Sequence, residues 1–177
     1  IMQPYFFPYI GYFQLISLSD DFVFYDDVNF IKQGWINRNK ILVSNQEKRI
    51  TVPCSKISSN EKINKIKLSN VANREIKKIL KTIKQAYARA PYFDRIIPII
   101  SKVLVSQEEK ISELSIRSIK EVCKYLELKP NFYKSSEDFR HSQDIERSKR
   151  VISIAKSLKG SAYINMIGGK DLYKKGD

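Results

Sequence analysis

The segment of this sequence most suited to chemistry joins two adjacent carboxylates to a run of bases, amides and one indole. In "YDDVNFIKQGWINRNKI", Asp26 and Asp27 follow directly after a short apolar run. Such a pair could bind a magnesium ion or two sugar hydroxyls, or one carboxylate could act as a general base. We take both aspartates, together with Lys32, as candidate catalytic residues. The alternative is a solvated loop held by local salt bridges.

The residues after the aspartates could hold a polar, partly anionic ligand. Arg38 carries a guanidinium, which recognises phosphate or carboxylate through two parallel hydrogen bonds. Its neighbours Trp35, Asn37 and Asn39 add an indole and two amides to an irregular segment, as is typical of binding pockets. We expect these four residues to bind substrate. The alternative places Trp35 in the core.

A second candidate is the opening segment "QPYFFPYIGYF". Pro4 and Pro8 fix φ and remove two backbone donors, so this segment is expected to be extended and rigid. Gly11 permits a positive φ, or close approach of a ligand at the start of a helix, where free N–H groups attract anions. We assign substrate binding here to Gln3, Tyr5, Tyr9, Gly11 and Tyr12. The alternative is that these rings pack under the edge of a sheet.

A third candidate is the glycine pair in "SAYINMIGGKDLY". Gly168 and Gly169 could expose backbone N–H groups to substrate after an apolar strand, and Lys170 could complete an anion site. The segment lacks both the GxxxxGK[ST] and the GxGxxG patterns, so it does not indicate a particular nucleotide. No cofactor is indicated either. A single histidine and two cysteines outside any CxxC pair predict no classical zinc site.

The composition is that of one globular α/β domain of 177 residues, with 42% apolar and 29% charged residues. No apolar run approaches the roughly 20 residues that span a bilayer, and two lone cysteines favour a reducing cytoplasm. The net charge of +13 is spread along amphipathic segments such as "NREIKKILKTIKQAYAR", where it indicates a solvated helix face. Nucleic-acid binding is therefore the least favoured function. We expect further sequence beyond both ends, and the oligomeric state is not predicted.

Alternating strands and helices must position these motifs. Hydrophobic periodicity predicts helices and strands in the following order: a helix over 11–18, a strand over 22–25, a hairpin from "KILVS" and "KRITVPC", an edge strand in "INKIKLS", helices over 73–89, 94–104 and 106–128, a strand in "NFYKSS", a helix in "DIERSKRVISIAKSL" and a strand in "SAYINMI". Ser106 with Glu109 matches a capping box at the third of the consecutive helices. This order predicts a parallel sheet, with residues 45–128 as an insertion or helical cap. Ligands of such sheets bind beyond the carboxyl ends of the strands, where all three candidate segments would converge.

Several motifs resemble, in order, those of the WbqC-like family: "QPYFFPYIGYFQLI", "DDFVFYDDVNFIKQGWINRNKI", "TVPC", "APYF" and "GGKDLY". The resemblance covers essentially the whole chain, and its first two motifs are specific. It implies a bacterial protein whose genes tend to lie in clusters for O-antigen and other surface polysaccharides.

A remoter similarity links "YIGY" to the HxGH start of nucleotidyltransferases, with tyrosine at both histidine positions. It implies a Rossmann-like sheet of the nucleotidyltransferase or HUP kind. Because tyrosine cannot carry positive charge at neutral pH, it also leaves nucleotidyl transfer in doubt.

Three functions follow from these observations. The first is a cytoplasmic enzyme of surface-polysaccharide biosynthesis that acts on a nucleotide-linked sugar or amino sugar, with acyl, aminoacyl or nucleotidyl transfer as the reaction. The second is a non-catalytic ligand-binding or assembly protein on a degenerate nucleotidyltransferase-like fold. The third is a nucleic-acid binder. The first two predict a small anionic or sugar ligand.

Overall fold

Two short strands that lie far apart in the sequence pair at the centre of the fold. In the computed structural model, which describes residues 1–166, β1 (Asp21–Phe24) runs parallel to β4 (Asn131–Lys134). At the other edge of β1, Met2 forms a parallel bridge with Phe24, and its backbone exchanges hydrogen bonds of 2.9 and 2.8 Å with the residues that flank Phe24. The first residues of the chain therefore extend the parallel sheet.

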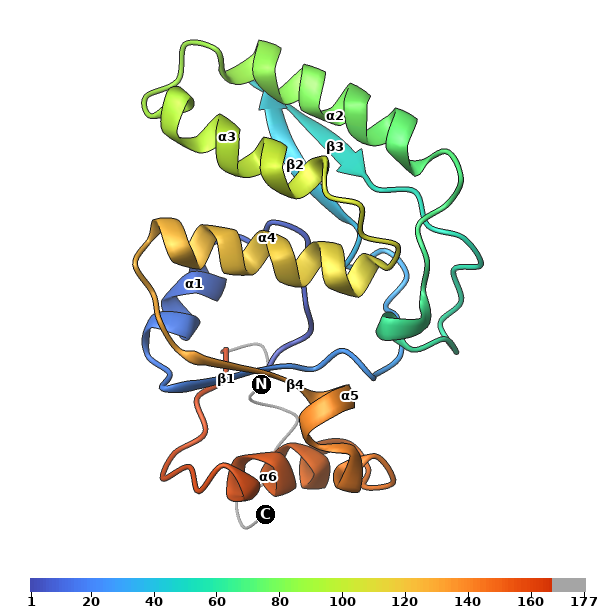
Figure 1. The fold of residues 1–177 in the computed structure, drawn as a ribbon, viewed down its shortest axis with the longest axis vertical. Coiled ribbons are helices and arrows are strands. Elements are labelled where there is room, and N and C mark those ends of the chain that lie inside the picture. Colours follow the sequence, from blue (N-terminus) through green and yellow to red (C-terminus); the bar gives the residue numbers. More distant parts are fainter. Residues whose placement is uncertain (167–177) are drawn as a thin grey trace.

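Helices cover both faces of this sheet, because alternate residues of each strand point to opposite sides. Phe22, Phe24 and Phe132 pack with α1 (Ile10–Ser17) and α4 (Ile111–Tyr125) on one face. Val23 packs on the other face with α6 (Arg147–Ser157), next to α5 (Ser135–Asp138) and a 3₁₀ turn over Arg140–Ser142. The result is a helix–sheet–helix layering (Figure 1).

A second body of structure lies beyond α4. The hairpin of β2 (Arg38–Val43) and β3 (Gln46–Thr51) turns through Ser44 and Asn45, both with positive φ, as in a two-residue hairpin loop. Helices α2 (Ala72–Tyr87) and α3 (Phe93–Leu104) pack against it over a separate apolar core (Figure 1). The described residues thus form a mixed α/β fold with six α-helices, a small parallel sheet and a hairpin. None of its helices has the length and apolar character needed to cross a membrane.

Three expected elements are wrong within the described residues. Ser106 does not cap α4, because α4 begins at Ile111. The Oγ of Ser106 donates instead to Val103 O at the end of α3, at 2.6 Å. Residues 161–166 form no strand, and Gly168 and Gly169 lie outside the described residues. The expected edge strand is a 3₁₀ turn over Ile63–Lys65 followed by isolated bridges, because no neighbouring strand offers it a continuous ladder.

Candidate functional site

The ends of β1 and β4 bring two aspartates and two serines together. Because the strands are parallel, Asp26 after β1 and Ser135 and Ser136 after β4 reach the same edge. The backbone N–H and the Oγ of Ser136 donate to the two carboxylate oxygens of Asp26, at 3.0 and 2.7 Å. Ser135 Oγ lies 3.1 Å from Asp26 and also donates to Asp27. The predicted carboxylate pair is therefore at the carboxyl edge of the sheet, but its oxygens already have protein partners.

Asp27 forms an ion pair with Arg150 of α6 inside the protein. Arg150 Nη2 lies 2.6 Å from Asp27 Oδ2, and both residues are less than 5% exposed. The guanidinium also donates from Nε to Ser142 Oγ at 3.2 Å and lies over the Tyr25 ring. Burial by itself would raise the pKa of Asp27, but the hydrogen bonds from Arg150 and Ser135 and the charge of Arg150 lower it overall. A carboxylate held ionised in this way is poorly suited to act as a base near neutral pH.

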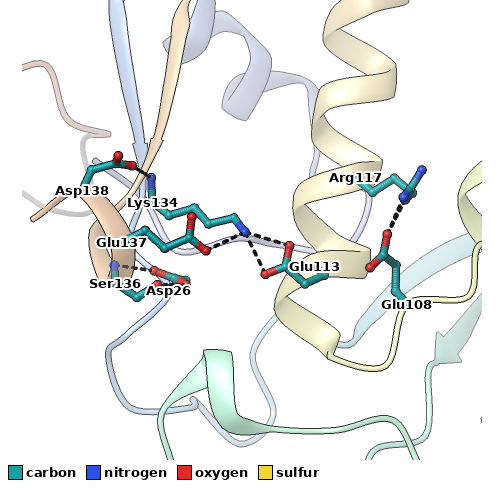
Figure 2. A network of polar contacts seen from close by, with 8 residues as sticks. All are labelled: Asp26, Glu108, Glu113, Arg117, Lys134, Ser136, Glu137 and Asp138. Atoms are coloured by element: carbon teal, nitrogen blue, oxygen red, sulfur yellow. Dashed lines mark hydrogen bonds and ion pairs between the residues drawn. The ribbon is translucent and has the colours of Figure 1, made fainter. Parts of the chain in front are cut away.

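Lys134 connects the end of β4 to the first turn of α4. Its Nζ lies 3.0 Å from both carboxylate oxygens of Glu113 and 3.2 Å from Glu137 (Figure 2). Its backbone N–H donates to Asp138 at 2.7 Å. Burial by itself would lower the pKa of Lys134, but the hydrogen bonds and charges of Glu113 and Glu137 raise it overall. Lys134 therefore joins the end of β4 to the first turn of α4 through its ion pair with Glu113.

Several buried polar atoms have no hydrogen-bond partner within the described part of the chain. They are Gln3 Oε1, Asn64 Oδ1, Ser69 Oγ and Ser112 Oγ. Three of the four come from segments that reach the carboxyl edge. Gln3 follows the residue that bridges to β1, Asn64 donates its backbone N–H to Asp26 O at 2.8 Å, and Ser112 precedes Glu113. Since buried polar groups are nearly always hydrogen-bonded, Gln3, Asn64 and Ser112 are candidate ligand contacts.

The opening tyrosines divide between core and surface. Tyr12 is fully buried among the rings of the sheet, and its hydroxyl donates to Gln3 O at 2.9 Å. Burial raises the pKa of Tyr12 well above its usual value. Tyr9 is 60% exposed, and Tyr5 is half-buried against Tyr12. A Cβ added at Gly11 would overlap the Tyr9 ring. The absence of a side chain at Gly11 therefore makes room for the ring of Tyr9.

Asn39 anchors the opening segment. Its Nδ2 donates to the carbonyl oxygens of Phe6 and Phe7, while Phe7 N–H donates to Ser118 Oγ at 3.0 Å. These bonds hold Phe7 at a φ of 47°, in the left-handed region that is costly for a bulky residue. The rigidity expected from the two prolines is therefore supplemented from β2 and α4.

The remaining predicted binding residues lie in the segment that leads into β2. Asn37 is buried and donates to the carbonyl of the residue after β3, at 3.0 Å. Arg38 donates from Nε to a carbonyl of its own loop at 2.8 Å. Trp35 is 45% exposed rather than part of the core, and Lys32 is exposed. The cation that pairs with Asp27 is thus Arg150, whereas the carboxylate of Asp26 binds Ser135 and Ser136.

The sequence contained one signal for Arg150 that was missed. It shares a helical face with Ile154 and Leu158, which pack with Val23 of the sheet. An arginine on such a face is rarely buried unless it is paired with an acidic group. Within residues 1–166, no group of three or more His, Cys, Asp or Glu side chains is arranged to hold a metal ion.

Comparison with known proteins gives a family but no assigned activity. The model of the WbqC-like protein family matches residues 3–177. The chain is 31% identical over 128 residues to "Uncharacterized protein Rv1507c" of Mycobacterium tuberculosis. That match covers 71% of this chain and 54% of the relative, so the chain spans about half the length of that protein. No solved structure matches the chain.

Proposed function

This chain belongs to the WbqC-like protein family, and from that premise we propose that it is an enzyme of bacterial surface-polysaccharide biosynthesis. It would bind a nucleotide-linked sugar or amino sugar and transfer an acyl, aminoacyl or nucleotidyl group. The observation that carries the proposal is the set of unpartnered polar atoms of Gln3, Asn64 and Ser112 on segments that reach the carboxyl edge. Sugars present many hydroxyl groups, which such atoms would satisfy on binding.

The arrangement around the sheet supports a Rossmann-like fold as part of this proposal. Met2, β1 and β4 run in parallel with helices on both faces, and ligands of such folds bind beyond the carboxyl ends of the strands. Gln3 and Asn64 would then accept hydrogen bonds from sugar hydroxyls, while Ser112 would donate one. The catalytic role predicted for Asp26 and Asp27 stays a prediction.

Further residues complete the proposed binding site. Exposed Tyr9 and Trp35 would stack on flat parts of the ligand, and Lys32 and Arg38 would contact its phosphates. Tyr5 would line the site beside Tyr9. The glycine pair after residue 167 keeps its predicted role in binding the anionic part.

Thermal-shift and calorimetric titration with UDP- and dTDP-linked sugars and amino sugars tests the proposal. A bound nucleotide sugar should raise the unfolding temperature of the wild type. Gln3→Ala, Asn64→Ala and Ser112→Ala should each weaken binding at least about tenfold, or roughly 1.4 kcal/mol. Asn131→Ala is the matched control, because Asn131 binds Asp21 at the opposite edge of the sheet. Equal binding by wild type and all three variants would contradict the site.

The closed state of the aspartates favours a second candidate, a non-catalytic ligand-binding or assembly protein. Asp26 and Asp27 are 1% and 3% exposed, and their oxygens bind Ser135, Ser136 and Arg150. Substituting Asp26→Asn separates the two functions once a nucleotide sugar that binds has been found. Loss of group transfer with retained affinity supports the enzyme. Binding without turnover in the wild type, over a panel of acyl and aminoacyl donors, supports the second candidate.

A further inference from the structure

An apolar cavity of about 290 Å³ lies between the β2–β3 hairpin and the α2–α3 corner, away from the carboxyl edge. Much of its lining is formed by isoleucines from four elements: Ile41, Ile50, Ile83, Ile96, Ile97 and Ile100. Phe7 of the opening segment and Phe93 of α3 also line it. We propose that this cavity binds the aliphatic chain of a medium-chain carboxylate. This inference does not depend on the proposed function.

The polar groups in the lining are already engaged, so the part of the ligand inside the cavity must be apolar. The amide of Asn39 binds the carbonyls of the opening segment. The Tyr87 hydroxyl accepts a hydrogen bond from Leu42 N–H at 2.9 Å, and Lys40 pairs with Glu47 at 2.6 Å. A polar ligand would lose most of its hydrogen bonds to water and find few replacements here.

The size of the cavity sets the length of the chain. Engineered apolar cavities of about 150 Å³ bind benzene and stay dry when empty. A volume of about 290 Å³ is roughly twice as large, which suits a flexible chain of about six to eight carbon atoms. Branched aliphatic walls contact such a chain along its whole length, whereas a rigid polar ring would leave gaps.

Positive charge on the segments that line the cavity favours an anionic head group. Lys40 lines the cavity, and four further cations are exposed and adjacent in sequence to lining residues: Arg49, Lys84, Arg89 and Arg95. The exposed carboxylates in the same segments belong to Glu47 and Asp94. With five cations against two carboxylates, these segments attract a negatively charged head that remains in water.

Isothermal titration with sodium butanoate, hexanoate and octanoate, together with octan-1-ol, tests the inference. Each added methylene should tighten binding about three- to fourfold, as expected for complete burial of a CH₂ group. Octan-1-ol, which lacks the negative charge, should bind more weakly than octanoate. Affinity independent of chain length would overturn the cavity as the site, and equal affinity for the alcohol would overturn the anionic head group.

Two variants locate the binding. Ile97→Trp and Ala90→Trp each place a large ring in the lining of the cavity, so each should reduce octanoate affinity at least tenfold. Ile97 packs against the apolar core and Ala90 does not belong to it. Val105→Trp is the control, because Val105 is 64% exposed and lies outside the cavity. If Ile97→Trp fails to fold by circular dichroism, Ala90→Trp decides. Unchanged affinity in a folded Ala90→Trp protein would refute the proposal.

Discussion

Replacing Arg150 with methionine should destabilise the protein strongly, because it leaves a buried carboxylate without its cation. Arg150 is 4% exposed, and its guanidinium lies 2.6 Å from Asp27 and 3.2 Å from Ser142. Methionine retains much of the apolar volume but supplies neither hydrogen bond. Removing one partner of a buried ion pair typically costs about 3–5 kcal/mol. We therefore expect the free energy of unfolding to fall by about that amount.

Urea denaturation monitored by circular dichroism measures this change. For a chain of this size, each kcal/mol corresponds to roughly 2–4 °C, so the midpoint of thermal unfolding should fall by about 10 °C. The double variant Asp27→Asn, Arg150→Met should recover part of the loss, because it buries no unpaired charge. Arg117→Met is the control. Its pair with Glu108 is 40% and 22% exposed, which predicts a loss of no more than about 1 kcal/mol.

The same pair sets a pH dependence of known sign. Since the pKa of Asp27 is lower in the folded protein than in the unfolded chain, its ionisation contributes stability above the unfolded value of about 3.9. That contribution is lost as the pH falls through the folded value. In Arg150→Met, protonation of Asp27 instead relieves the buried charge. The difference in stability between wild type and variant should therefore shrink from pH 7 to pH 3. A difference below 1 kcal/mol at pH 7, or one that does not change with pH, would refute this reasoning.

Three further variants or measurements test other parts of the structure. Ser112→Ala should leave the free energy of unfolding in urea unchanged or slightly higher, because the Ser112 hydroxyl is buried without a described partner. Ser115→Ala removes a 2.8 Å hydrogen bond to the carbonyl of Ile36, and it should lower the free energy of unfolding by about 1–2 kcal/mol. Asn39→Ala should cost about 1–3 kcal/mol and speed proteolysis of the opening segment, measured by the rate of chymotryptic cleavage after Tyr5 or Phe6. Burial raises the pKa of Cys54 to about 12 and that of Cys123 to about 11, so at pH 8 iodoacetamide should label both thiols only after unfolding in urea.

Local patterns in the sequence predict the elements better than they predict the partners of polar side chains. The four-residue apolar run before Asp26 predicts a strand because a strand buried on both faces needs consecutive apolar residues, and β1 is such a strand. The isoleucine spacing of α2 predicts a helix for an equally local reason. Arg150, by contrast, lies 123 positions from Asp27, and no local pattern reports a contact over that distance. In the sequence, Asn39 looks like an ordinary loop amide. In the structure its side chain binds the carbonyls of Phe6 and Phe7, 33 and 32 positions away, which no local pattern predicts.

The carboxyl edge is the part of the candidate site that could be predicted. Parallel pairing places the ends of β1 and β4 together, so Asp26 had to lie beside whatever follows β4. The sequence could not reveal that Ser135 and Ser136 would bind that carboxylate. Their hydroxyls match many loop residues in type, and only the register of the pairing selects them.

The central pairing also has a consequence for the order of folding. Asp21 and Asn131 lie opposite each other although 110 positions separate them, and closing a chain of that length costs about 4 kcal/mol in entropy. The hairpin and the α2–α3 pair need only short closures, so we expect them to form early and the sheet to form after the rate-limiting barrier. Val23→Ala should then accelerate unfolding while leaving the refolding rate nearly unchanged in stopped-flow measurements. The buried ion pair of α6 would be among the last contacts made, and it would therefore slow the loss of the native state more than it speeds its formation.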